Sequence, residues 1–313
     1  MVSIATPAGL RGEVVEAATA LGCNIVSEKP LATTAEEAWR IYRLAADAGI
    51  KHAYAATHRY GPGIAWLREL IQSGRIGTLR DILATYCLPL SPLTPWCWAH
   101  SLANGGGLLN QELPHLLGVL ERLAGGEVTR VMGEARIERR SAPVVPGLHD
   151  FRVTVRTGFG LTQEAAAKLE WRPVDAETAY SALMRFRAPD GQVRVTVIDG
   201  MGRSAGHAFT GIHLYGTAGA LHLEDLTSQA AAYLAYDAET PESLPVPQQL
   251  QQALPDLGNP VDNQWAALAR DFTADLRGEP HDPYLTFHDG WRYQQVIDAI
   301  RAGAGWQEID GRS

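Results

Sequence analysis

Two short segments of the chain carry residues that could move a proton. Glu28-Lys29-Pro30 follows a short apolar run, and Gly105–His115 (GGGLLNQELPH) joins three glycines to the start of a helix. A lysine amine and a histidine imidazole that share a cleft are suited to acid–base chemistry on a hydroxyl group. Each residue also has an ordinary interpretation, Lys29 as a surface lysine in a loop and His115 as a buried or capping histidine.

The segment that would position Lys29 alternates between strand and helix. The pattern predicts strands at 1–7, 24–27 and 52–56, and helices at 9–21, 34–48 and 62–72. Such alternation predicts a parallel sheet, beyond whose strand ends ligands bind, so Lys29 and Arg59 are expected at one edge. We interpret this region as the second half of a dinucleotide-binding domain. The glycine-rich phosphate loop of such a domain would precede it and is not in this chain.

The pattern changes near residue 78, where longer runs joined by turns predict one large, mostly antiparallel open sheet. Its expected strands are 79–88, 128–138, 151–156, 180–187, 193–199 and 212–215, and its expected helices are 109–124, 263–277 and 287–302. Residues 225–262 are expected to form a long surface excursion. The fold class is therefore α/β plus α+β: a partial Rossmann-like domain over 1–77, then a substrate and oligomerisation domain over 78–313.

Composition narrows the class of protein. The net charge of −8 and the isoelectric point near 5.7 disfavour nucleic-acid binding. No apolar run is long enough to cross a membrane, and the first residues lack a secretory signal pattern. The three cysteines lack metal-ligand spacing, so we expect no metal site and a reducing, cytoplasmic location. The glycines at 158 and 160 precede Gln163 rather than a third glycine, which argues against a dinucleotide loop there.

Several motifs in order resemble the Gfo/Idh/MocA family, the glucose–fructose oxidoreductase and inositol dehydrogenase group. They are Ile4–Pro7, Glu28–Ala32, Leu67–Gly77, Gly105–His115 and Ile212–Leu221. The resemblance implies hydride transfer between NAD or NADP and a hydroxyl-bearing carbon of a sugar, cyclitol or related polyol. It also implies that Lys29 contacts the reacting hydroxyl and assists proton transfer, and that His115 is the general acid/base.

The same resemblance assigns binding roles by position. It implies that the cofactor is bound by Ala5, Thr6, Pro7, Glu28, Lys29 and Arg59. Asn110, Gln111 and Trp98 are the expected substrate-binding residues. The family places an aspartate where this chain has Gln111, and an amide cannot accept a proton at neutral pH. Glu112 is one position further along and is expected to point elsewhere on the helix.

Two alternatives to an active enzyme remain open at this stage. The chain could be a catalytically silent family member, or a ligand-binding or oligomerising subunit. By resemblance, a homo-oligomer is expected to form through the large sheet. The apolar strand at residues 2–6 is expected to be a sheet edge or to be covered by a partner chain, because an unpaired strand invites association.

Overall fold

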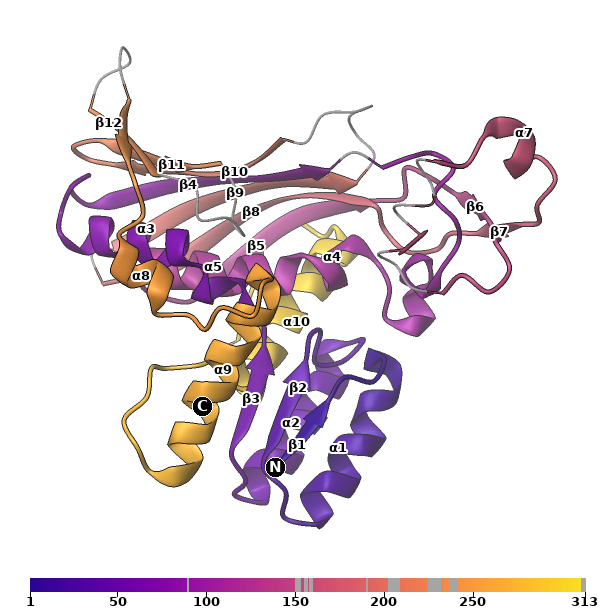
Figure 1. Cartoon of the computed structure of the whole chain (residues 1–313), viewed down its shortest axis with the longest axis horizontal. Helices are drawn as coiled ribbons and strands as arrows, with labels where there is room; N and C mark the ends of the chain where they lie inside the picture. Colours follow the sequence, from indigo (N-terminus) through magenta and orange to yellow (C-terminus); the bar gives the residue numbers. More distant parts are fainter. Residues whose placement is uncertain are drawn as a thin grey trace.

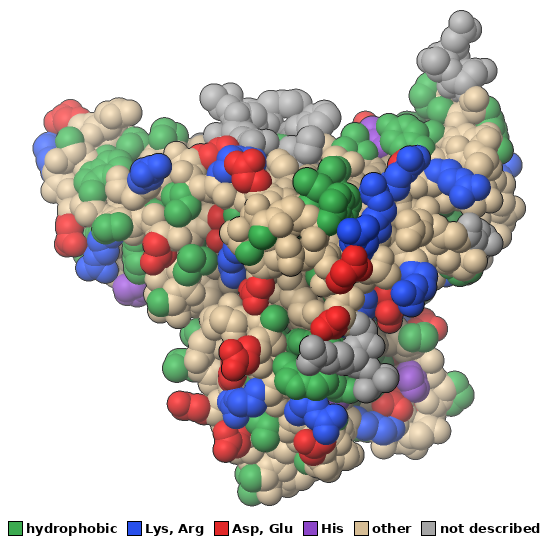
Figure 2. Space-filling model, turned by 180° about the vertical axis from the view of Figure 1, so that it is seen from behind, with side chains coloured by type: hydrophobic (Ala, Val, Ile, Leu, Met, Phe, Trp, Pro, Cys, Tyr) green, Lys and Arg blue, Asp and Glu red, His purple; other side chains and the backbone are tan. Residues whose placement is uncertain are grey.

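The described residues form two main sheets, with helices packed between and around them, and a third sheet of two short strands (Figure 1). The computed structural model describes residues 1–310 except 89, 150–152, 155–156, 158–159, 190, 202–208, 225–231 and 237–240. A wide sheet lies above the smaller sheet in Figure 1, and the view from behind shows the small unit as a narrower stem (Figure 2). Basic and acidic side chains are interspersed on the face seen in Figure 2.

The smaller sheet has three parallel strands in the order β1 (Val2–Ile4), β2 (Ile25–Glu28), β3 (His52–Ala55). Helices α1 (Arg11–Ala20) and α2 (Ala35–Asp47) follow β1 and β2 and cover one face of the sheet. The predicted parallel alternation is therefore confirmed. Thr34 caps α2, its hydroxyl accepting the Glu37 N–H at 3.2 Å. Within the part of the chain that is described, β1 pairs with β2 alone and is an edge strand.

The last two helices of the chain return to this small sheet. In α9 (Pro260–Arg277), Leu268 and Phe272 pack on Val26 and on the alanines of β3, which covers the face opposite α1 and α2. Helix α10 (Phe287–Ala302) packs along α2, and the backbone N–H of Tyr54 donates to Leu285 O at 2.7 Å. The expected domain boundary after residue 77 divides the chain by sequence alone. In the structure, the unit built on the small sheet also includes helices α9 and α10.

The larger sheet has nine strands in the order β13–β12–β11–β10–β4–β9–β8–β5–β14, and its β4–β9 pair is parallel while its other pairs are antiparallel. The strands are β4 (Leu79–Leu88), β5 (Val128–Arg136), β8 (Ala179–Ala188), β9 (Gly191–Met201), β10 (Phe209–Gly216), β11 (Ala220–Leu223), β12 (Ala232–Ala235), β13 (Glu242–Leu244) and β14 (Gln307–Glu308). This confirms the expected open, mostly antiparallel sheet. Helices α3 (Pro62–Gln72), α4 (Leu108–Gln111), α5 (Leu113–Ala124) and α10 all lie on one side of it (Figure 1).

Two expectations for this half of the chain were wrong. Residues 151–156 were expected to form a strand, but Val153 and Thr154 are helical, and the other residues of that range lie outside the described residues. The expected excursion at 225–262 instead contains β12, β13 and helix α8 (Gln248–Gln252), and α9 begins within it. The remaining elements that the structure describes are the antiparallel pair of β6 (Ser141–Pro143) and β7 (Trp171–Pro173), α7 (Gln163–Ala166) and the short 3-10 turns η1 (Ala8–Leu10), η2 (Thr57–Tyr60), η3 (Trp98–His100) and η4 (Leu102–Asn104). Over the described residues, none of the helices is both long and apolar enough to cross a bilayer.

His52 joins the start of β3 to the first turn of α10, and this contact predicts acid sensitivity. Its Nδ1 accepts the Phe287 N–H at 3.1 Å, and its ring stacks on Phe287 with the centroids 4.7 Å apart. Burial lowers the pKa of His52 from 6.5 to about 4, so the unfolded chain binds the extra proton first. Stability is therefore lost as the pH falls from about 6.5 towards about 4, by about 2 kcal/mol at pH 5.

Urea unfolding at pH 7 and pH 5 tests this expectation. His52→Gln keeps an acceptor for the Phe287 N–H but cannot titrate, so its stability should fall less with pH than that of the wild type. His149→Gln, at an exposed histidine, is the matched control and should follow the wild type. An equal loss for His52→Gln and the wild type would show that His52 is not the acid-sensitive group.

Candidate functional site

Lys29 lies just beyond the carboxyl end of β2 and reaches across to the other unit. Its Nζ donates a hydrogen bond to the backbone carbonyl of Gln111, at the end of α4. Its own N–H donates to the Glu28 carboxylate at 2.9 Å, which orients the residue at the strand end. The lysine of the first motif and the glycine-rich second motif are therefore brought together across the two units.

His115 lies in the first turn of α5, where its ring contacts that of His58 in η2. The His58 and His115 rings are stacked with centroids 3.9 Å apart and an interplanar angle of 14°. Burial, and then the positive charges that His58 and Lys29 can carry, hold the pKa of His115 well below its usual range. The imidazole is therefore neutral at pH 7 and can accept a proton.

The helix expected over 109–124 is interrupted at Glu112, between α4 and α5. Pro114 has no N–H to continue the hydrogen-bond ladder, and so it belongs in a first turn. The break leaves the Gln111 carbonyl available to Lys29, so Gln111 meets the ammonium through its backbone.

Glu112 is the acidic residue that sequence reasoning set aside. Burial raises the pKa of its carboxyl, and the Lys29 ammonium acts in the opposite direction. The Glu112 carboxyl is therefore close enough to Lys29 for the two charges to interact, which sequence reasoning did not anticipate.

The glycine run allows close packing rather than an open loop. Gly105 and Gly107 have φ of +78° and +98°, and a Cβ on Gly107 would lie 2.2 Å from a Glu177 carboxylate oxygen. The same carboxylate accepts the Leu109 N–H at 3.1 Å and pairs with Arg301 at 2.8 Å. Glu177 therefore fixes the start of α4, and so helps to position the end of this helix, where the Gln111 carbonyl accepts from Lys29.

Asn110 is buried in this loop. Its Nδ2 donates to the carbonyls of Gly105 at 3.2 Å and Gly106 at 2.9 Å. Its Oδ1 is buried and has no hydrogen-bond partner among the described residues. The amide nitrogen thus holds the loop together, and the side-chain oxygen is the atom left to meet a ligand.

Arg11 is a buried residue that the sequence reasoning missed. Its guanidinium donates to Thr6 O at 2.6 Å and to Glu28 O at 2.7 Å, and it also donates to Pro30 O. Burial lowers its pKa to about 10, which leaves it charged at neutral pH. Arg11 therefore ties together the ends of β1 and β2, where most of the expected cofactor residues lie. A single arginine in an otherwise unremarkable helix gave no signal for this role.

The other expected site residues lie on several different elements of the fold. Ala5, Thr6 and Pro7 follow β1, and Arg59 sits in η2 beside His58. Trp98 lies on η3 with 40% of its surface exposed. The structure thus gathers the expected cofactor residues at the strand ends.

The strand ends have features that fit a dinucleotide. The hydroxyls of Thr6, after β1, and Thr57, after β3, are buried and lack a hydrogen-bond partner in the part of the chain that is described. Two such groups at one edge suit the hydroxyl and amide groups of a ribose and a nicotinamide. Among the described residues, no cluster of three or more histidine, cysteine or acidic side chains is arranged to hold a metal ion.

The fold and this site define a class of protein. In this class a nucleotide-binding type of α/β unit is joined to an open-sheet domain, and a histidine of the second domain lies near the strand ends of the first. Residues 1–55 match the model of an oxidoreductase family with an NAD-binding Rossmann fold, and residues 64–222 match that of the GFO/IDH/MocA C-terminal domain. The chain belongs to the GFO/IDH/MocA family.

Known proteins resemble this chain over different lengths. Levoglucosan dehydrogenase of Pseudarthrobacter phenanthrenivorans is 33% identical over 193 residues, which are 59% of this chain but 46% of that protein. A dTDP-3,4-didehydro-2,6-dideoxy-alpha-D-glucose 3-reductase of Streptomyces antibioticus is 26% identical over 93% of this chain and 73% of its own length. A solved levoglucosan dehydrogenase in complex with NADH and L-sorbose superposes with a TM-score of 0.77 at 22% identity, covering 99% of this chain and 79% of that one, and shows the shared fold.

Proposed function

We propose that this chain carries the reaction centre of an NAD(P)-dependent oxidoreductase acting on a hydroxyl-bearing carbon of a sugar or cyclitol. The proposal rests on the Lys29 ammonium, which donates a hydrogen bond to the Gln111 carbonyl at the carboxyl end of β2 and is near enough to His115 to oppose a positive charge on its ring. The related proteins support the substrate class, because their names include levoglucosan, inositol and D-xylose dehydrogenases.

In the proposed reaction, Lys29 and His115 divide the work on one hydroxyl group. The Lys29 ammonium donates a hydrogen bond to the substrate oxygen and stabilises its developing negative charge. The neutral His115 imidazole accepts the hydroxyl proton as the C=O double bond forms. When bound, NAD or NADP supplies the acceptor for the hydride that leaves the same carbon. The substrate thus loses one proton to the protein and one hydride, and the reverse reaction returns both.

The remaining residues would hold the reactants in place. Thr6, Thr57 and Glu28 would bind the nicotinamide ribose and amide, because they lie at the ends of β1, β3 and β2, and Arg11 fixes the first and last of these ends. Asn110 Oδ1 and the Gln111 amide would meet further substrate hydroxyls, which a polyol offers in number. Cys23, Cys87 and Cys97 are reduced thiols, which suits a cytoplasmic setting.

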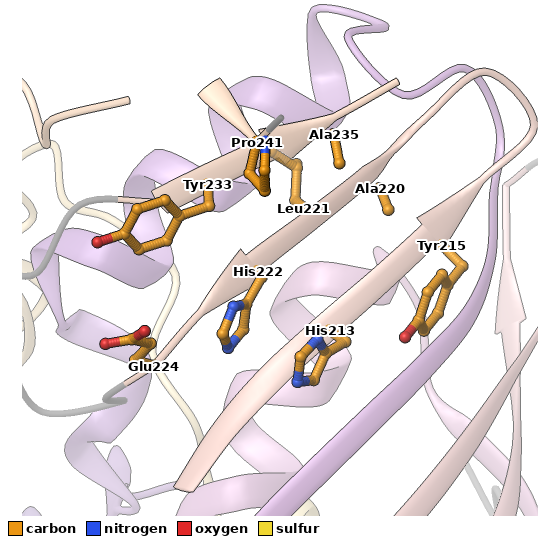
Figure 3. Close-up of a pocket in the computed structure, with 9 residues that line it drawn as sticks. All are labelled: His213, Tyr215, Ala220, Leu221, His222, Glu224, Tyr233, Ala235 and Pro241. Atoms are coloured by element: carbon orange, nitrogen blue, oxygen red, sulfur yellow. The ribbon is translucent and has the colours of Figure 1, made fainter. Parts of the chain in front are cut away.

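We also propose that two copies associate through the outer face of the large sheet. Helices cover the opposite face, while β10, β11 and β12 present His213, Tyr215, His222 and Tyr233 around a shallow pocket of about 350 Å³ (Figures 1 and 3). The strand register extends this row across the sheet from His213 to Leu83, and then through Thr196 to Leu183 and Met132. Sedimentation velocity of the whole chain tests the association.

Nucleotide binding and turnover are measured separately to test the proposed reaction. The whole chain is titrated with NADH and NADPH by fluorescence, and is then assayed for nicotinamide reduction with levoglucosan, myo-inositol and D-xylose. Turnover that disappears in His115→Asn supports the proposal. Nucleotide binding with no turnover on any polyol would identify a silent member of the family, and no nucleotide binding at all would overturn the proposal.

A further inference from the structure

The stacked His58–His115 pair has no role in the reaction as described so far. A histidine that acts as a base is ordinarily oriented by a third group bonded to its other ring nitrogen. Here His115 Nδ1 is buried and has no hydrogen-bond partner among the described residues. The His58 ring, face to face at 3.9 Å, is therefore the contact that can set the plane of the His115 imidazole.

We propose that His58 is a positioning residue, whose ring holds the His115 imidazole in the orientation that turns one nitrogen towards the hydroxyl bound at Lys29. The proposal rests on the proposed function to the extent that His115 is the proton acceptor. His58 comes from η2 at the end of β3, whereas His115 comes from α5 beneath the large sheet. The stack therefore also ties the strand ends that would hold the cofactor to the helix that carries the base.

The charges around His115 give the stack a second consequence. The groups that act on it are His58 from η2 and Lys29 from the end of β2, and both oppose a positive charge on its ring. With the rings this close, two imidazolium charges repel strongly in a buried setting. A proton that His115 takes from the substrate must therefore leave before the next turnover.

Two substitutions of His58 distinguish the effect of its stacked ring from the effect of its ring nitrogens. His58→Phe keeps a flat ring for stacking but cannot be protonated, and its π face favours a cation on His115. His58→Ala removes the stack and lets water reach His115. The titration of His115 is followed by NMR in the whole chain with isotope-labelled histidine, its signal being assigned by its loss in His115→Asn.

We expect the midpoint for His115 to rise in both variants, because each removes an opposing charge. The low-pH limb of kcat/KM for polyol oxidation should move to higher pH with it, since His115 must be neutral to accept the proton. At pH 8 we expect His58→Ala to lower kcat/KM by about 10²-fold, the size of effect that misplacement of a reacting group produces. His58→Phe should lose much less, because the stacked ring is retained.

The chain offers a matched control in a second stacked histidine pair. His213 and His222 lie on the outer face of the large sheet with centroids 4.0 Å apart and an interplanar angle of 7° (Figure 3). His222→Phe makes the same chemical change outside the site and should leave the His115 titration where it is. An equal shift in His222→Phe would mean that the effect is general, and would overturn the proposal.

The two readouts separate failure of this inference from failure of the proposed function. NMR needs no turnover, so a moved His115 titration supports the pairing even if no polyol is oxidised. An active wild type whose His58→Ala variant keeps both its rate and its pH profile would overturn the positioning role and leave the oxidoreductase proposal intact. An unmoved titration in both His58 variants would also overturn it.

Discussion

Lys29→Met should lower kcat/KM for polyol oxidation by about 10³-fold, within the range that positioned acid–base groups contribute. Methionine is unbranched and about as long as the lysine stem, so the substitution removes the ammonium while largely keeping the packing. The substrate oxygen then loses the donor that stabilises its developing charge, and the Gln111 carbonyl loses its hydrogen bond. Nucleotide affinity should change far less, because Thr6 and Thr57 remain in place. Steady-state assays with parallel NADH titrations measure both quantities.

Lys168→Met is the matched control for this variant. Lys168 follows the end of α7, and its amine forms an exposed ion pair with Glu164 at 3.2 Å. Such pairs contribute little to stability, so the control should retain wild-type kinetics and melting temperature. A Lys29→Met protein that keeps more than about a tenth of wild-type kcat/KM would rule out Lys29 as a main contributor to the proposed step.

The meeting of Lys29 with the second motif could be predicted because it follows from chain topology. Glu28-Lys29-Pro30 ends a strand in a parallel β–α alternation, and the ends of such strands share one edge. The parallel sheet order and the Thr34 cap follow from equally local signals. Motif order along the chain then supplied the histidine, since Gly105–His115 stands where the resembling family carries its acid/base residue.

The finer geometry of the site depended on tertiary contacts that local patterns do not encode. The apolar spacing over 109–124 suits one continuous helix, whereas Pro114 breaks it at Glu112 and so changes which atoms of Gln111 and Glu112 face Lys29. The stack of His58 on His115 joins residues that are 57 positions apart in the chain, so no local pattern indicates it. The alternating apolar residues near Val153 fit a strand as well as a helix, and only the packed fold decides between them.

The packing of the C-terminal helices was hidden for a similar reason. An amphipathic pattern predicts that α9 and α10 bury one face each, but it does not say against what. In the structure, Leu268 and Phe272 of α9 pack on the small sheet. Early and late segments of the chain therefore both contribute to the unit that carries Lys29. The position of Lys29 therefore depends on contacts made within that unit, among which those of Arg11 are the most direct.

Arg11→Met is expected to reduce the free energy of unfolding by about 3–5 kcal/mol, because one buried and two partly buried carbonyl acceptors lose their donor at once and each unsatisfied group costs about 1–3 kcal/mol. The carbonyls belong to Thr6, Glu28 and Pro30, so the loss also frees the backbone on both sides of Lys29. We therefore expect a lower melting temperature together with a fall in kcat at saturating substrate. Arg11→Lys should be intermediate, because one ammonium cannot reproduce the planar fork of a guanidinium.

Arg40→Met on the neighbouring helix α2 gives the contrast that makes this result specific. Arg40 is 44% exposed and pairs with Glu37 at 2.9 Å and with Glu16 at 3.3 Å, so its removal should change stability by less than about 1 kcal/mol. Thermal unfolding of the three variants, followed by circular dichroism, ranks them directly. If Arg11→Met melts together with Arg40→Met, the three carbonyls are satisfied in some other way, and the position of Lys29 must be set by β2 and the contact with Gln111 alone.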